Sequence, residues 1–179
     1  MVNAGVKLIH EHGPESLSIR KTAAAAGVSH AAPAHHFPTL THLRTAIAAH
    51  GHRQFAAMMK AEMVAEMDKS PHATLLAAGR GYVNFARENP ALYHLMFGGS
   101  EKNISDPELQ QSAQISYAVL IDITQPLAPG EIGEEGNQLL VWSILHGFAG
   151  LVLNDHSGRI DKDSAPQLLE KIFPDLPLR

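Results

Sequence analysis

Apolar residues recur along much of the chain at intervals of three and four, the spacing of one face of an α-helix. Between Leu40 and Lys69 the apolar positions are Leu43, Ile47, Phe55, Met58, Met59 and Met63. Thr39 can cap this long helix at its start. No alternating, strand-like pattern competes with the helical spacing. The predicted fold class is therefore all-α.

Prolines, glycines and polar runs divide the rest of the chain into further helices. Proline is favourable at the first helical position, where its missing N–H has no intrahelical partner to lose. The predicted helices are residues 71–89, a short helix after Pro90 that carries residues 92–97, residues 107–125, residues 131–154 and a last short helix from about Ser164 to before Pro174. At 179 residues the chain can hold a small head and one ordinary helical core.

Near the N-terminus, two short helical segments are separated by Gly27-Val28-Ser29. Ser18 and Ser29 are placed to cap these helices, and Gly27 supplies the positive φ that a sharp helix end prefers. The alanines before Gly27 are small enough for two helices to cross closely. A helix, a tight turn and a second helix form the arrangement that places a recognition helix in the DNA major groove. An alanine-rich helical hairpin without a ligand is the alternative.

Charge is distributed unevenly along the chain, whose net charge is −4. Residues 1–60 hold six basic and two acidic residues and eight of the twelve histidines, whereas residues 61–179 hold eight basic and sixteen acidic residues. A basic head on an acidic body suits a protein that presents one end to a polyphosphate. Its affinity for DNA should be modest and strongly salt-dependent.

From about Val6 to Ile47 the sequence resembles the DNA-binding domain of the TetR family of bacterial transcriptional regulators. The matching pieces are Glu11-His12-Gly13, Leu17-Ser18-Ile19-Arg20, Ala23, Gly27-Val28-Ser29, Ala32, His36-Phe37-Pro38, Leu43 and Ala46-Ile47-Ala48. The resemblance implies a three-helix DNA-binding head at residues 1–48 and a helical effector-binding and dimerisation body at residues 49–179. Ala34 and Leu40 stand where the family usually has a Tyr and a Lys that contact DNA phosphates.

The same region supplies the candidate DNA contacts. We predict that Ser29, His30, Ala31, Pro33 and His35 face the groove and that Ser18 and Arg20 contact phosphate. His36 belongs to the same DNA-binding set and also packs. Histidines at these positions can donate to phosphates or bases, more strongly when they are protonated. With alanines and a proline at the tip, DNA shape would have to contribute to recognition.

Residues 139–153, LLVWSILHGFAGLVL, are apolar on nearly every side of a helix. One side can face the core of the body and the other an identical subunit, which predicts a twofold dimer. A central core helix in a monomer is the alternative. The TetR resemblance also implies dimerisation, through the last two long helices. The pattern Trp142-x-x-x-His146-Gly147 resembles a subgroup of TetR C-terminal domains named for a Trp-His-Gly signature.

Aromatic and soft side chains of the body form a candidate effector pocket. An apolar cavity with a few polar tips is the usual design of a small-molecule site. The candidates are Tyr82, Phe85, Tyr93, Met96, Phe97, Tyr117, Trp142 and His146. The same residues at helical spacing also suit an ordinary hydrophobic core, which remains the alternative.

Other kinds of site find little support in the sequence. The paired histidines are adjacent or two apart rather than three or four apart, and the chain has no cysteine, so neither a metal site nor a cofactor is predicted. No nucleotide-binding loop or nucleophile motif indicates an enzyme. No uninterrupted apolar run of about 18 residues and no signal peptide is present, so we expect a cytoplasmic protein.

These patterns together favour a ligand-responsive transcriptional regulator, a repressor that binds a palindromic DNA operator as a homodimer and responds to a small-molecule effector. The alternative is a dimeric small-molecule-binding protein on the same fold that has lost DNA binding. Ala34, Leu40 and a short first helix are the features that keep this alternative open.

Overall fold

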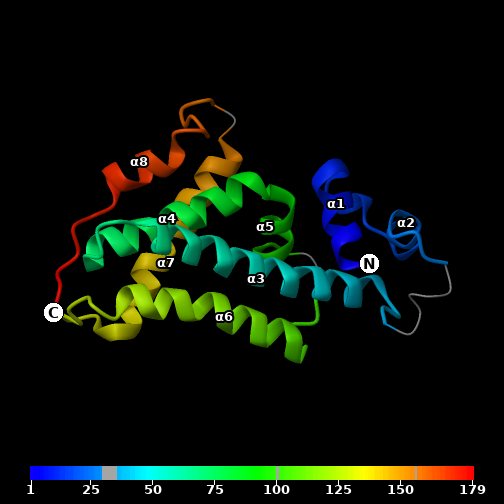
Figure 1. The fold of residues 1–179 in the computed structure, drawn as a ribbon, viewed down its shortest axis with the longest axis horizontal. Helices are drawn as coiled ribbons and strands as arrows, with labels where there is room; N and C mark the ends of the chain where they lie inside the picture. Colours follow the sequence, from blue (N-terminus) through cyan, green and yellow to red (C-terminus); the bar gives the residue numbers. More distant parts are fainter. Residues whose placement is uncertain (30–35, 100, 156) are drawn as a thin grey trace. The chain divides into compact units, whose positions relative to one another are not determined.

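The computed structural model describes residues 1–29, 36–99, 101–155 and 157–179 (Figure 1). The described residues form α1 (Val2–His12), the 3₁₀ turn η1 (Pro14–Ser16), α2 (Ile19–Ala25), α3 (Leu40–Ala65), α4 (Pro71–Glu88), α5 (Pro90–Phe97), α6 (Pro107–Thr124), α7 (Gly133–Asn154) and α8 (Ala165–Ile172). Their only extended pairing is an isolated bridge between Leu127 and Leu178. The all-α prediction is confirmed.

Most helix boundaries lie within two residues of the predicted ones. Helices α4, α5 and α6 each begin at a proline, as the sequence indicates. The long helix α3 is the exception, because it ends at Ala65 rather than near Lys69. The Lys69 ammonium turns back and donates to the carbonyl oxygens of Met63 and Val64, 3.0 and 3.1 Å away, which satisfies acceptors that the end of the helix leaves free.

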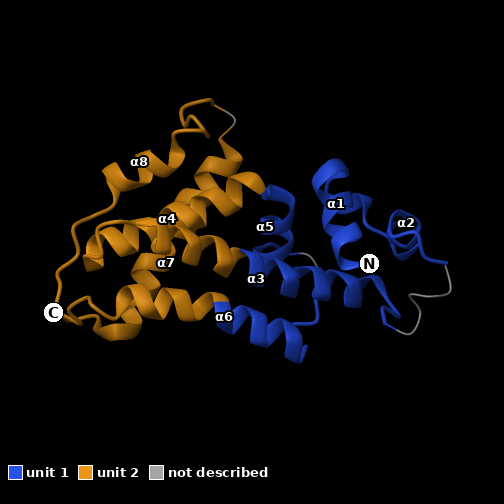
Figure 2. Cartoon of the chain, in the orientation of Figure 1, with its two compact units in different colours: residues 1–54, 89–115 blue, residues 55–88, 116–179 orange. Residues whose placement is uncertain are grey.

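The chain divides into two compact units that do not follow chain order (Figure 2). Unit 1 contains residues 1–54 and 89–115, and unit 2 contains residues 55–88 and 116–179. Helices α3 and α6 therefore contribute residues to both units. In unit 1, α1 packs against α2, η1 and α5. The buried apolar residues of unit 1 include Ile9, Leu17, Leu43, Ile47, Leu92 and Leu95.

Unit 2 is built around α4, which packs against α7 and α8. Its buried apolar residues include Leu75, Val83, Phe85, Val141, Leu145, Val152 and Leu169. Helix α4 also approaches the second half of α3 closely at Gly81. A Cβ atom added to Gly81 would lie 2.6 Å from the Cα of Met59, so the two backbones are in contact at this point.

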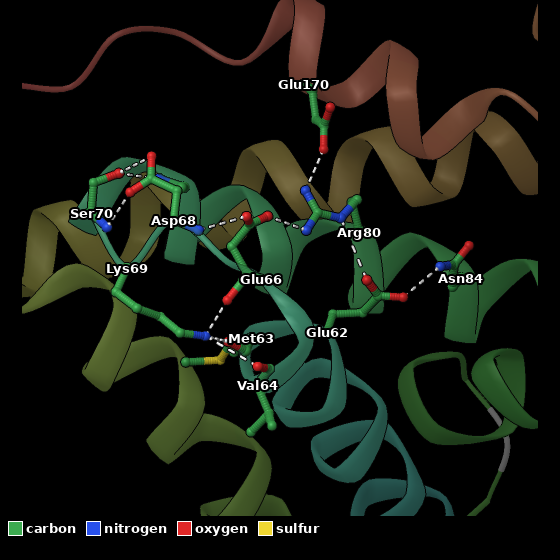
Figure 3. Close-up of polar contacts among 11 residues, drawn as sticks. Glu62, Met63, Val64, Glu66, Asp68, Lys69, Ser70, Arg80, Asn84 and Glu170 are labelled. Carbon is green, nitrogen blue, oxygen red and sulfur yellow. Dashed lines mark hydrogen bonds and ion pairs between the residues drawn. The ribbon is translucent and has the colours of Figure 1, made fainter.

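An arginine ties three helices of unit 2 together (Figure 3). Arg80 of α4 pairs with Glu62 and Glu66 near the end of α3, at 3.4 and 2.7 Å, and with Glu170 of α8. The hydrogen bond from Arg80 lowers the pKa of the Glu66 carboxyl below its usual value. Because the guanidinium is only about one-fifth exposed, this cluster holds the end of α3, α4 and α8 together more firmly than a surface ion pair would.

Candidate functional site

The first helix of the predicted helix-turn-helix has the caps that the sequence indicates. The Ser18 hydroxyl accepts from the Lys21 backbone N–H at 3.2 Å, at the start of α2. At the other end Gly27 has a φ of 68°, and the Val28 N–H donates to the Ala23 carbonyl at 3.1 Å. A left-handed residue with this hydrogen bond is a Schellman ending, which turns the chain sharply out of the helix. The predicted cap and turn are both confirmed.

The candidate DNA-contacting residues lie partly within the described part of the chain. His30, Ala31, Pro33 and His35 lie outside the described residues. Ser29 and His36, on either side of that gap, are exposed, as is Arg20 in the first turn of α2. Exposure leaves these three side chains accessible to a DNA backbone or groove, and their contacts with DNA stay a prediction.

The first turn of α3 adds candidates that the sequence analysis did not single out. The Thr39 hydroxyl accepts from the His42 backbone N–H at 3.4 Å and pairs with the His42 ring Nδ1 at 2.8 Å, which confirms Thr39 as the cap. Both side chains are exposed at the N-terminus of a 26-residue helix, the end that favours anions. The sequence did offer a signal for this site, because His42 stands two residues after Leu40 in the first turn of a long predicted helix.

Three of the candidate effector residues form a connected group in unit 2. The buried Tyr82 hydroxyl hydrogen-bonds the Nδ1 of His146 at 2.9 Å, and the His146 ring lies 6.2 Å from the Trp142 ring. Burial lowers the pKa of His146, so its imidazole is neutral near pH 7. A neutral imidazole, a phenol and an indole beside apolar surface can recognise a polar group on an otherwise apolar molecule.

The other candidate effector residues differ in their surroundings. Phe85 is buried in unit 2, where its ring lies 5.1 Å from that of Phe55. In unit 1, Tyr93 and Met96 are buried and Phe97 is half-buried. The predicted residues therefore divide between the two units, and their role as an effector pocket stays a prediction.

Helix α7 buries one face and leaves the other open. Asn137, Val141, Leu145, Phe148 and Val152 line the buried face, at helical spacing. Gly147 and Gly150 lie on the opposite side, where an added Cβ would have no atom within 4 Å. The α6–α7 apolar surface consists of the exposed residues Tyr117, Ile121, Leu139, Leu140, Trp142 and Leu151.

A side-chain hydrogen bond links the two helices that carry the α6–α7 apolar surface. The Tyr117 hydroxyl of α6 donates to the Gln138 side-chain oxygen of α7 at 2.7 Å. Within the described part of the chain, α7 is also long and apolar enough to cross a membrane. A helix covered by its own core on one side and by a partner on the other has the same composition, so length and hydropathy alone decide little.

Titratable side chains give no sign of a metal centre in the described residues, where no group of three or more histidine, cysteine or acidic residues could hold an ion. The exposed basic residues of the head, by contrast, include Lys7, Arg20 and Lys21, so the chemistry available there is contact with anions.

The comparisons with known proteins divide the chain into two matched regions. Residues 2–47 match the model of bacterial regulatory proteins of the tetR family, and residues 75–175 match that of the tetracyclin repressor-like C-terminal domain. The chain belongs to the TetR family. It is thus a transcriptional regulator with a helix-turn-helix DNA-binding head, as its sequence indicated. Members of this family are regulatory proteins, and the Trp-His-Gly pattern stays an interpretation of the C-terminal region.

Solved structures share the TetR fold over nearly the whole chain. A protein of unknown function from Rhodococcus sp. RHA1 is 24% identical, with a TM-score of 0.78 over 95% of this chain and 89% of that one. A regulatory protein in the tetR family from Rhodococcus RHA1 is 17% identical, with a TM-score of 0.67 over 99% and 95% of the two chains.

A third similar structure is the multidrug binding protein EbrR in complex with imidazole. It is 19% identical, with a TM-score of 0.63 over 97% of this chain and 93% of that one. At these identities the likeness concerns the fold alone. A search of curated proteins found no match to this chain.

Proposed function

We propose that this TetR-family regulator is a cytoplasmic, ligand-responsive repressor that binds a palindromic operator as a homodimer. Residues 1–48 form the DNA-binding domain, and residues 49–179 bind the effector and dimerise. The match of residues 2–47 to the family's DNA-binding region carries the proposal. The capped α2 and the turn at Gly27 support it, because a short helix that ends in a tight turn is the first half of a helix-turn-helix. The protein acts by binding rather than by catalysis.

Contacts with DNA come from two kinds of residue. Ser18, Arg20 and the first turn of α3 contact phosphates, while Ser29, His30, Ala31, Pro33 and His35 face the groove and His36 belongs to the same DNA-binding set. Phosphate contacts set the position of the head on the duplex, and contacts with base edges select the sequence. Two heads related by a twofold axis would enter successive major grooves, so the operator should be an inverted repeat.

Selection of random DNA duplexes by the purified protein at physiological salt tests this function. We expect enrichment of an inverted repeat. On the selected duplex, Arg20→Ala should weaken binding about tenfold and flatten the dependence of affinity on salt by about one phosphate contact. Fluorescence anisotropy over a salt series measures both effects.

Arg159→Ala is the matched control, because Arg159 is an exposed arginine of the body. Equal affinities of wild type and Arg20→Ala would show that Arg20 is wrongly assigned. A selection without enrichment would favour the second candidate, a dimeric ligand-binding protein that has lost DNA binding. Leu40 is the observation behind that candidate, because no cation stands where the family usually has a lysine.

The α6–α7 apolar surface supports a second copy of the chain as the partner. Its exposed leucines and Trp142 surround Gly147 and Gly150, whose lack of side chains lets another helix approach closely. Exposed apolar surface of this kind is costly in water, and a twofold contact would cover it with the same surface of the partner.

Gly147→Arg should convert the dimer to a monomer. Nothing lies within 4 Å of an added Cβ at this position, and arginine has a higher helix propensity than glycine, so the isolated chain should fold at least as well. In a dimer the new charge would be buried against the partner helix, and we expect the dissociation constant to rise by more than 100-fold. Sedimentation velocity over a concentration series measures this constant.

Gln167→Arg introduces the same side chain at an exposed position of α8 and serves as the control. We expect Gln167→Arg to remain dimeric. If Gly147→Arg also remains dimeric with an unchanged dissociation constant, α7 is not the dimerisation helix.

The effector site is proposed in the body, with Tyr82, Trp142 and His146 as its polar tips. The EbrR structure is described as that of a multidrug binding protein in complex with imidazole. An apolar effector held by these residues would favour one of two positions of α3, which carries the head at its first turn. Such a ligand regulates only if it binds the two states unequally. An effector found by a thermal-shift screen should therefore change operator affinity, and a bound ligand without that effect would contradict this mechanism.

A further inference from the structure

A short extended segment after α8 is paired with the loop that joins α6 and α7. The Ala128 N–H donates to the Pro177 carbonyl at 2.9 Å, and the Arg179 N–H donates to the Pro126 carbonyl at 3.0 Å. These two bonds enclose the antiparallel bridge between Leu127 and Leu178. Leu127 is buried, so the loop is held in place by both backbone pairing and packing.

The Arg179 side chain adds two bonds of its own. Its Nε donates to the Leu127 carbonyl at 3.0 Å, and its terminal nitrogen pairs with Glu134 in the first turn of α7. On the inner side, the buried Asn137 amide of α7 donates to the Ala128 carbonyl at 2.9 Å. Arg179, whose side chain is 46% exposed, therefore bonds to both the loop and the start of the helix that follows it.

The bonds from Arg179 hold a stretch of backbone that contains two glycines with positive φ. Gly130 in the loop has a φ of 52° and Gly133, the first residue of α7, has a φ of 72°, and glycine loses more conformational freedom on folding than any other residue. Arginine suits the role because its planar group offers several donors in fixed directions, whereas lysine has a single ammonium. The family match ends at residue 175, so residues 177–179 lie beyond the region that the family model describes.

We propose that Arg179 is a positioning residue for self-association. It holds the start of α7 against the α6–α7 loop and thereby sets the shape of the α6–α7 apolar surface that meets the second copy. The inference rests on the dimer proposed above. Arg179 does not itself contact the partner in this scheme. Its effect passes through Leu127 and Glu134.

The dimer dissociation constant of Arg179→Ala tests the inference. We expect this constant to rise about tenfold, with helical content unchanged by circular dichroism. Arg179→Lys, which keeps the charge but cannot keep both bonds, should have an intermediate effect. Lys171→Ala removes a positive charge from an exposed position of α8 and should leave the constant unchanged.

A double-mutant cycle distinguishes the positioning of α7 by Arg179 from an effect of removing its positive charge. If Arg179 acts through Glu134, adding Glu134→Gln to Arg179→Ala should weaken the dimer less than Glu134→Gln does alone. A second readout uses the monomeric Gly147→Arg background, in which Arg179→Ala should lower the thermal midpoint only slightly, because the backbone bridge between Leu127 and Leu178 and the burial of Leu127 remain.

Three results would overturn the inference. The first is an unchanged dissociation constant in Arg179→Ala, and the second is full additivity of the two substitutions. The third is a large fall in the thermal midpoint of the monomeric background, which would indicate a purely structural role. A wild-type chain that is monomeric at tens of micromolar would instead contradict the proposed dimer. Sedimentation of the wild type alone therefore distinguishes a failure of the proposed dimer from a failure of the role given to Arg179.

Discussion

Gly81→Ala should lower the free energy of unfolding by about 2–3 kcal/mol, although alanine is the better helix former. The added methyl carbon would lie 2.6 Å from the Cα of Met59 and 2.9 Å from the carbonyl oxygen of Met58. These are backbone atoms of α3, which cannot rotate away as the end of a side chain can. Helices α3 and α4 would have to separate, and their packed contacts would be lost along both helices.

Gly79→Ala is a matched control two residues earlier on the same helix. Its added carbon would meet only the side-chain ends of Leu169 and Leu145, at 2.9 and 3.1 Å. These methyl groups can shift, and the gain in helix propensity, about 1 kcal/mol, offsets the remaining crowding. We therefore expect a change of less than about 1 kcal/mol for Gly79→Ala. Urea unfolding of both variants measures the difference, and equal losses would mean that α3 and α4 are not in backbone contact at Gly81.

Between pH 7 and pH 4 the wild type should lose about 3 kcal/mol of stability through His52 alone. His52 is buried in unit 1, with its ring 5.5 Å from that of Phe97. Burial, with a smaller effect of the Lys102 charge, lowers the pKa of His52 from 6.5 to about 4. Between pH 6.5 and about pH 4, the His52 imidazole is protonated in the unfolded chain but stays neutral in the folded chain. The stabilisation is therefore complete above pH 6.5 and is lost as the pH falls through this window.

His52→Leu removes the titrating group and should reduce the pH dependence of the unfolding free energy by about the same amount. Urea unfolding at half-unit steps from pH 7 to pH 4 measures it. His72→Gln, at an exposed histidine of α4, controls for the loss of an imidazole. An identical pH profile for His52→Leu and wild type would mean that His52 accepts a proton in the folded state as easily as in the unfolded chain. Burial also lowers the pKa of His50 and His146, so some dependence should remain in the variant.

Local signals predicted most helix ends because the residues that mark them act on backbone within a few positions of themselves. Ser18 caps α2 with its own hydroxyl, Gly27 adopts a conformation that other residues avoid, and prolines begin α4 and α5. The end of α3 was placed too late, because Lys69 satisfies the last carbonyls from outside the helix. That interaction depends on how the chain turns after Ala65, which no local pattern reports.

The candidate effector residues show where the sequence stops being informative. Apolar and aromatic character placed Tyr82, Tyr117 and Trp142 in one predicted set. In the structure Tyr82 is buried, whereas Tyr117 and Trp142 are exposed and belong to the α6–α7 apolar surface. Hydropathy gives the tendency of a side chain to be covered, but it does not say whether a core, an effector or a second chain covers it.

By itself the sequence determined that the chain is helical, where most helices begin and that basic charge gathers in the N-terminal part. Through its resemblance to the TetR family it also indicated a helix-turn-helix there. These properties depend on residues close together in the chain. Only the tertiary structure decided that Arg80 joins three helices, that Gly81 lies against the backbone of α3 and that Arg179 grips the start of α7. Such contacts join residues that are far apart in the chain. Each side chain has many possible partners, and only the packing of the helices selects among them.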